Sequence, residues 1–237
     1  LAGASAVAVY GLPLVGTVLR RVEVVDGLPG RVRTSLLWRH VRRRGTEIVR
    51  VGRHFAVALP DSLIDLARWS GVMAGVAAMD EALHNRLCSV EAMEEALERL
   101  PATARGGPRA RQAVRLADGR SESPGESMSR VRMWEHRLPK PELQVSVRVG
   151  QELYILDYYW PEHEVAGEFD GRVKYRSASF GQDPEDVVWR EKLREDALRA
   201  SGLTVARWTW AQAWGDAGTQ MLRRLAAAGV RPTGRRW

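Results

Sequence analysis

Three acidic residues, Asp157, Glu168 and Asp170, lie in a stretch that is typical of a β-hairpin, LDYYWPEHEVAGEFDG. If the turn centres between Glu162 and His163, the numbers of facing residues sum to 325, and Asp157 then lies opposite Glu168. Side chains in such a pair are about 5 Å apart at Cβ. Glu168 and Asp170 are two apart on one strand and point to the same face, so the spacing predicts three converging carboxylates. A slip of one residue would separate them.

Opposed carboxylates raise the energy of a fold unless a cation or a shared proton offsets the repulsion. Oxygen ligands in a chain with one cysteine, Cys88, point to Mg²⁺ or Mn²⁺. Such an ion lowers the pKa of bound water and stabilises charge at phosphorus. Glu126 on the preceding helix could add a fourth acid, although Ser123-x-x-Glu126 is also a helix capping box. Asp170-Gly171 is also a common turn dipeptide.

The charge of the chain points to a nucleic-acid partner. It has 36 Lys and Arg against 29 Asp and Glu, a net charge of +7, and nearly all of the bases are arginine, which pairs bidentately with phosphate. A GC-rich genome would give the same arginine bias. The densest cluster, RHVRRR at residues 39–44, predicts phosphate contacts that set affinity without sequence choice; a solvated loop is the alternative. Its contacts would come from Arg39, Arg42, Arg43 and Arg44.

Composition excludes several classes of protein. A hydrophobic content of 45% excludes a disordered chain, and no run reaches the roughly 18 apolar residues of a membrane helix. One cysteine cannot form an intramolecular disulfide, which suits a reducing compartment, so we expect a cytoplasmic protein with no membrane partner. The first residue is Leu1 and not Met, so we expect the sequence to begin inside a longer chain.

Patterning divides the 237 residues into two domains. We predict a basic, mostly helical α+β domain over 1–104, a linker with a short helix near 108–117 over 105–122, and a second domain over 123–237. The elements expected in the first domain are helices at 2–10, from an Asp61 N-cap onward, at 72–87 and at 90–100 behind a Ser89 cap, with strands at 22–25 and 47–51. Those expected in the second form the order α-β-β-β-α-β-α: helix 123–137, strands 143–149, 152–159 and 165–170, a long helix ended by Gly202, strand 203–209 and helix 210–227.

A family resemblance rests on SESPGES, LDYYWPEHEVAGEFDGRVKY and DPEDVVWREKLREDALRASGLTVARWTW. These segments resemble the C-terminal domain of a large actinobacterial family, which is similar to the very-short-patch-repair endonucleases of the PD-(D/E)XK nuclease superfamily. Many members also carry an N-terminal helix-turn-helix similar to AbiEi-type antitoxins. The resemblance covers about residues 120–227 well and extends weakly to LAGASAVAVYGLPL and to 63–68.

The resemblance implies an α/β fold with a restriction-endonuclease-like αβββαβ core and a mixed sheet. A smaller AbiEi-like domain precedes this core, and a helix-turn-helix would lie upstream of Leu1. The implied ligands of Mg²⁺ or Mn²⁺ are Glu126, Asp157 and Glu168. The third-strand motif of the superfamily is acid-x-Lys, whereas this chain has Asp170 in the place of the lysine. Lys174 or Lys192 would then have to supply the cation.

These observations predict a metal-dependent DNA endonuclease that hydrolyses phosphodiesters, with Asp157, Glu168, Asp170 and Lys174 as its catalytic residues. Duplex DNA is the expected partner, and a homodimer is compatible because many duplex cutters act in pairs. Two alternatives stay open. One is a catalytically inactive DNA-binding transcriptional regulator or antitoxin-like protein, and the other is a protein-interaction module without a nucleic-acid partner. Further nucleic-acid contacts are expected from Arg172, Arg176 and Lys192.

Overall fold

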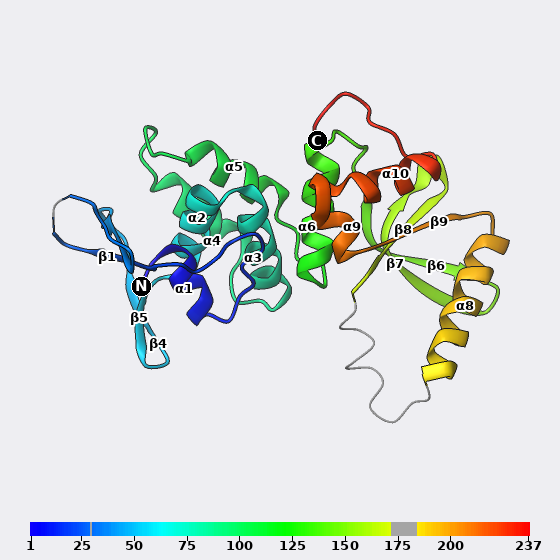
Figure 1. Ribbon diagram of the computed structural model, residues 1–237, viewed down its shortest axis with the longest axis horizontal. Coiled ribbons are helices and arrows are strands. Elements are labelled where there is room, and N and C mark those ends of the chain that lie inside the picture. Colours follow the sequence, from blue (N-terminus) through cyan, green and yellow to red (C-terminus); the bar gives the residue numbers. More distant parts are fainter. Residues whose placement is uncertain (29, 172–183) are drawn as a thin grey trace. The chain divides into compact units, whose positions relative to one another are not determined.

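The computed structural model describes residues 1–28, 30–171 and 184–237, and the chain divides into two compact units (Figure 1). The first unit is Leu1–Ser127 and the second is Met128–Trp237. Both contain helices and sheets, so the chain is of the α/β class that the sequence predicts. Among the described helices, none is both long and apolar enough to cross a membrane.

The first unit contains two small sheets and a group of helices. In the three-stranded sheet β1-β3-β2, the central strand is parallel to β1 and antiparallel to β2, and β4 and β5 form an antiparallel hairpin. The helices and strands of the first unit are α1 (Gly3–Val9), β1 (Val22–Asp26), β2 (Val32–Arg33), β3 (Leu37–Val41), β4 (Ile48–Val51), β5 (His54–Val57), α2 (Leu59–Ser70), α3 (Val72–His84), α4 (Val90–Glu98) and α5 (Gly107–Leu116).

Helix α2 is the centre of the first unit, because it packs against α1, α3, α4 and α5. Its apolar side chains Leu63, Ile64 and Leu66 are fully buried. The prediction that Asp61 caps this helix is wrong. The helix begins at Leu59 with Pro60 in its first turn, a position where the fixed φ of proline and its missing N–H are harmless. Asp61 therefore lies inside the helix, where it is buried in contact with arginines.

The segment predicted as a linker, 105–122, contains the predicted short helix, α5. Ala110 and Ala113 of this helix are fully buried, and the helix packs against α2 and α3. The segment thus contributes to the core of the first unit. The predicted Ser89 cap of α4 is confirmed, since its Oγ accepts a hydrogen bond from the backbone of Ala92.

The second unit has the predicted order of helices and strands. The sheet order is β6-β7-β8-β9, in which β7 is antiparallel to both β6 and β8, and β9 is parallel to β8. Helix α6 crosses the boundary between the units at Ser127. The elements are α6 (Pro124–Glu135), β6 (Glu142–Val149), β7 (Glu152–Trp160), η1 (Pro161–His163), β8 (Val165–Asp170), α8 (Pro184–Ala200), β9 (Thr204–Thr209), α9 (Trp210–Trp214), η2 (Gly215–Gly218) and α10 (Thr219–Ala227).

Helices α6 and α8 cover opposite faces of this sheet (Figure 1). On the α6 face, Trp208 stacks on Tyr158 and donates a hydrogen bond from Nε1 to Ser129 Oγ at 2.8 Å. Gly167 leaves room for these rings, since an added Cβ would lie 2.8 Å from Trp208. On the α8 face, Leu198 packs into a separate apolar cluster.

The last helix is not continuous, which corrects the prediction of one helix over 210–227. Helix α9 ends at Trp214, and Asp216 and Ala217 adopt φ of 46° and 50°, which no α-helix allows. A second helix, α10, begins only after Gly218, whose φ of 85° suits a residue without Cβ. The helical periodicity of the sequence continues through this break, which is why the pattern alone did not reveal it.

Candidate functional site

The acidic residues of the second unit lie where strands β7 and β8 separate. The observed pairs, such as Tyr158 with Gly167, have numbers that sum to 325, so the predicted register is confirmed. Continued by one step, this register sets Asp157 opposite Glu168. The ladder between the two strands instead stops at Gly167, and β8 continues alongside β9 only. The two carboxylates therefore belong to adjacent strands at the point where their backbone pairing ends.

Asp157 bridges the gap between the separating strands with its side chain. It is 7% exposed, and its Oδ2 accepts a hydrogen bond from the backbone N–H of Phe169 at 2.8 Å. This bond replaces the backbone hydrogen bond that the ended ladder no longer supplies. The other oxygen, Oδ1, makes no hydrogen bond with any residue that the structure describes.

At Asp157, the side chains of β7 stop alternating regularly between the two faces of the sheet. Leu156 packs with Ala166 and Leu198, whereas Tyr158 packs with Trp208 on the other face of the sheet. Residues two apart on a regular strand share a face, so the chain must change faces between them. On β6, the residue that would face Asp157 is Gln144, which has a φ of 51° and is missing from the ladder. This irregularity explains why Asp157 and both of its neighbours are buried.

Glu168 is an ion-pair partner of helix α8. It is 6% exposed, and its Oε1 accepts a hydrogen bond from Arg194 Nη2 at 2.9 Å. The same nitrogen donates to the carbonyl of Ile155 at 2.6 Å, so the guanidinium is tied to β7 as well. Asp170 is more exposed and lies 3.8 Å from Arg207. Guanidinium groups thus offset the negative charge at two of the three predicted acids.

Glu126, the fourth predicted acid, is in the first unit and caps helix α6. Its Oε1 accepts a hydrogen bond from Ser123 Oγ at 2.7 Å and its Oε2 accepts one from the backbone of Glu122 at 3.0 Å. Ser123 Oγ in turn accepts from the Glu126 backbone at 3.2 Å, which is one half of a capping box. The carboxylate completes this cap through the Ser123 hydroxyl and the Glu122 N–H, and not through the Ser123 N–H. Within 1–28, 30–171 and 184–237, no three acidic, histidine or cysteine side chains are gathered as metal ligands.

The basic cluster at residues 39–44 is largely tied to other residues of the first unit. Arg43 donates to Asp61 at 3.0 Å and also to Asp65, and these bonds hold the segment after β3 to helix α2. Arg42 donates to the carbonyl of Thr46 at 2.9 Å. Arg39 lies 3.5 Å from Asp26. Arg44 is exposed, so it is the member whose structural surroundings best suit a phosphate contact.

Of the remaining predicted basic residues, Lys192 is the one that lies in the described part of the chain. Arg172, Lys174 and Arg176 lie outside the described residues. Lys192 is exposed on α8, and its Nζ lies 5.8 Å from the centre of the Trp189 ring, close enough for a cation–π contact.

Comparison with known proteins gives two relatives from Mycobacterium tuberculosis. The uncharacterized proteins Rv2248 (strain ATCC 25618 / H37Rv) and MT2308 (strain CDC 1551 / Oshkosh) are each 31% identical to this chain over 203 residues. The alignment covers 85% of this chain and 70% of each relative. The chain belongs to the family of these mycobacterial proteins. No family model matches it, and no solved structure matches it.

This member of the family also has an arginine-rich pocket in its first unit, which the sequence analysis missed. Five arginines line it, and they come from three segments: the start of the β2–β3 hairpin, the end of α2, and the turn before α5 together with the first turn of α5. They are separated by up to 78 positions in the chain, from Arg31 to Arg109, so no local cluster announces them. The alternation of Trp38 and His40 on β3 is the one local signal, because it sets two aromatic rings on the same face of a strand.

Proposed function

We propose that the chain is a metal-dependent DNA endonuclease and that its second unit has a restriction-endonuclease-like core. The order α6-β6-β7-β8-α8-β9 and the mixed sheet β6-β7-β8-β9 support this, because they agree with the αβββαβ core that the resemblance implies. The observation that carries the proposal is the burial of Asp157 and Glu168 on adjacent strands at the point where those strands separate.

The donor set of this site fits Mg²⁺ or Mn²⁺. Carboxylates are the hard ligands these ions prefer, and Mg²⁺ is commonly held by only one or two of them together with water and substrate phosphate. Asp157 contributes Oδ1, which makes no hydrogen bond to a described residue. Glu168 would have to exchange Arg194 for the metal ion, and the released guanidinium could then hold a DNA phosphate.

Each residue has a separate role in the proposed hydrolysis. The ion would supply a water of lowered pKa and neutralise charge on the scissile phosphate. Asp157 and Glu168 would hold the ion. Asp170, or Lys174 from outside the described residues, would orient the water. The basic side chains Arg44 and Lys192 would contact the DNA backbone, which positions the duplex without reading its sequence.

Cleavage assays test the proposal with variants that remove a ligand charge while keeping its shape. We expect Asp157→Asn and Glu168→Gln to lose Mn²⁺- or Mg²⁺-dependent cleavage of plasmid, nicked, mismatched and single-stranded DNA. Glu152→Gln is the matched control, because Glu152 is an exposed carboxylate on the same strand as Asp157. Equal activity in all three variants, or a wild type that cuts none of the substrates, would contradict the proposal.

A second candidate is a DNA-binding regulator that keeps this fold without catalysis. The Glu168–Arg194 ion pair favours it, since a guanidinium already neutralises the carboxylate that would hold the metal. So does Asp170 in the position where the superfamily has its lysine. A gel shift that persists in EDTA, with no cleavage when divalent ions are added, would select this candidate. DNA association that is weak and insensitive to salt would instead indicate a protein-interaction module.

A further inference from the structure

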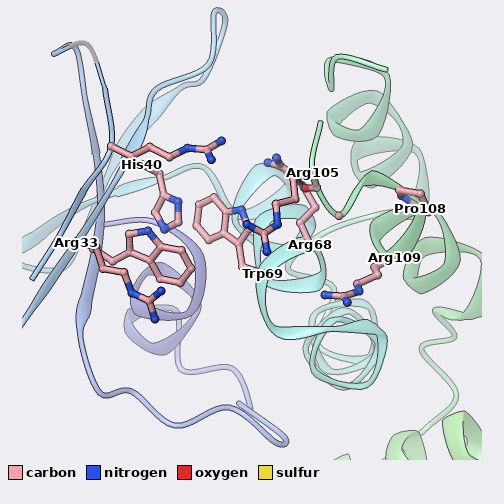
Figure 2. A pocket seen from close by; sticks show the side chains of 10 residues that line it. Arg33, His40, Arg68, Trp69, Arg105, Pro108 and Arg109 are labelled. Atoms are coloured by element: carbon pink, nitrogen blue, oxygen red, sulfur yellow. Dashed lines mark hydrogen bonds between the residues drawn. The ribbon is translucent and has the colours of Figure 1, made fainter. Parts of the chain in front are cut away.

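The arginine-rich pocket of the first unit has a volume of about 430 Å³ (Figure 2). Strand β3 contributes Trp38 and His40 to one wall, and the end of helix α2 contributes Trp69. The turn before α5 closes the pocket on the remaining side. This volume lies within the range of roughly 300–1,000 Å³ that small-molecule sites have, so the pocket can enclose a ligand.

The lining of the pocket is strongly positive. It contains five arginines and no acidic residue: Arg31, Arg33, Arg68, Arg105 and Arg109. Arg68 is fixed by Asp65, whose Oδ1 lies 2.6 Å from its Nη1, and by the carbonyl of Arg105 at 3.1 Å. The other four make no ion pair with a carboxylate anywhere in the described chain. Gathered like charges repel one another, and a bound anion would relieve that repulsion.

The pocket is also lined by three aromatic rings, which stack on one another with His40 between Trp38 and Trp69. The rings of His40 and Trp69 are parallel within 3°, with their centres 3.6 Å apart, and the Trp38 ring lies 4.5 Å from His40. The Arg33 guanidinium lies 4.9 Å from the centre of the Trp38 ring. Aromatic rings and guanidinium planes are the surfaces on which proteins stack nucleobases. His40 Nε2 is buried and has no hydrogen-bond partner among the described residues, so the pocket wall contains a polar atom whose hydrogen bond the described chain does not supply.

Helix α5 begins at the pocket and adds to its positive potential. Pro108 and Arg109 of its first turn line the pocket, and that turn contains no acidic residue. A helix N-terminus carries a partial positive charge that favours phosphate. Gly106 allows the turn to approach helix α2, because its φ is 78° and an added Cβ would lie 2.4 Å from the carbonyl oxygen of Arg68.

We propose that this pocket binds a nucleotide, with its phosphate held by Arg105 and Arg109 and its base against the Trp38, His40 and Trp69 rings. The nucleotide is either the phosphorylated end of a nucleic-acid strand or a free mononucleotide, because both present the same two groups. The pocket lies in the first unit and uses neither Asp157 nor Glu168. Binding is therefore independent of the proposed nuclease activity, and an Asp157→Asn protein must retain it.

Binding is measured in EDTA with the Asp157→Asn full-length chain, so that cleavage cannot confuse the result. The probes are a short single strand labelled at its 3′ end with a 5′-phosphate, the same strand with a 5′-hydroxyl, adenosine monophosphate and inorganic phosphate. The pocket variant is Arg105→Ala/Arg109→Ala. Its matched control is Arg111→Ala/Arg115→Ala, which removes the same charge from exposed positions of helix α5 outside the pocket lining.

We expect the pocket variant to lose about tenfold or more in affinity, as removal of a charge-assisted contact does, while the control changes about twofold or less. A preference for the 5′-phosphorylated strand over the hydroxyl strand assigns the site to strand ends. Tight binding of adenosine monophosphate without that preference assigns it to free nucleotides. Equal losses in the two double variants, inorganic phosphate competing as well as the nucleotide, or no binding of any probe would overturn the proposal.

Discussion

Glu168 and Arg194 form an ion pair of 2.9 Å between strand β8 and helix α8. The Glu168 side chain is 7% exposed and that of Arg194 is 24% exposed, so the pair is partly shielded from water and solvent screens it less than a surface pair. The guanidinium is a cation in contact with the carboxylate that we propose as a metal ligand. Whether the site binds metal depends on competition between these two cations for Glu168.

Because Arg194 and a metal ion would compete for Glu168, we expect the stability of the Arg194→Ala protein to depend on Mn²⁺. Removing Arg194 leaves a buried carboxylate without its partner, which should cost about 2–3 kcal/mol in the free energy of unfolding. Mn²⁺ should recover part of that loss, because a ligand that binds only the folded state stabilises it. Thermal unfolding with and without Mn²⁺ measures the effect. A Mn²⁺ response that persists in Arg194→Ala/Asp157→Asn would show that the ion binds elsewhere.

Arg43 and Arg44 are neighbours in the sequence, but we predict that only the loss of Arg43 lowers the stability of the first unit substantially. Arg43 contacts Asp61 and Asp65, both of which are 2% exposed, so Arg43→Ala leaves two buried carboxylates with one arginine fewer. We expect it to cost about 3 kcal/mol in the stability of the first unit. Arg44→Ala should change stability by about 0.5 kcal/mol or less, because its side chain is exposed.

Urea denaturation and DNA-binding titrations together test this pair. If Arg44 contacts phosphate, Arg44→Ala weakens DNA binding and lowers its dependence on salt while the unfolding curve stays unchanged. Equal stabilities for the two variants would refute the role assigned to Arg43.

Two glycines with nearly the same φ test whether the turn before α5 must approach helix α2 closely at the pocket. Gly106 has a φ of 78° and Gly11 a φ of 77°, but only at Gly106 would a Cβ meet another backbone atom, the carbonyl oxygen of Arg68. Gly11→Ala should cost about 1 kcal/mol through left-handed strain alone. Gly106→Ala should cost about 1–3 kcal/mol more and should weaken nucleotide binding. Equal costs in chemical denaturation would mean that the turn before α5 moves without penalty.

The sequence predicted those features that depend on local pattern. The strands of the second unit, their order and the hairpin register that sums to 325 follow from alternating hydrophobic residues and turn signals, and the structure confirms them. The prediction stopped at the face change of β7, because hydrophobic alternation gives no sign of the positive φ at Gln144. The ion pair of Glu168 with Arg194 joins residues 26 apart in the chain, and patterning places neither side chain relative to the other.

The pocket of the first unit was beyond prediction for a related reason. Its arginines become neighbours only when the β2–β3 hairpin, the end of α2 and the start of α5 meet. The cluster at 39–44 looked more important in the sequence because its arginines are adjacent. In the structure, Asp61 and Asp65 engage Arg43, whereas the sequence indicated only a helix N-cap at Asp61.

The acid sensitivity of the first unit should depend on His40. Burial, followed by the nearby Arg31 and Arg68 charges, lowers the pKa of His40 from 6.5 to about 4. Between these two values the unfolded chain binds a proton that the folded chain does not, so stability rises with pH. This contribution is fully present above pH 6.5 and is lost as the pH falls toward 4, with a slope of up to about 1.4 kcal/mol per pH unit.

Urea unfolding at a series of pH values from 4.5 to 7.5 measures that slope. We expect His40→Gln, which cannot be protonated, to flatten the slope below pH 6.5. A nucleotide phosphate in the pocket should raise the pKa of His40, because the anion favours the imidazolium. Adding the nucleotide should therefore reduce the slope in the wild type and not in His40→Gln. The same slope in wild type and His40→Gln would show that other groups govern the acid response.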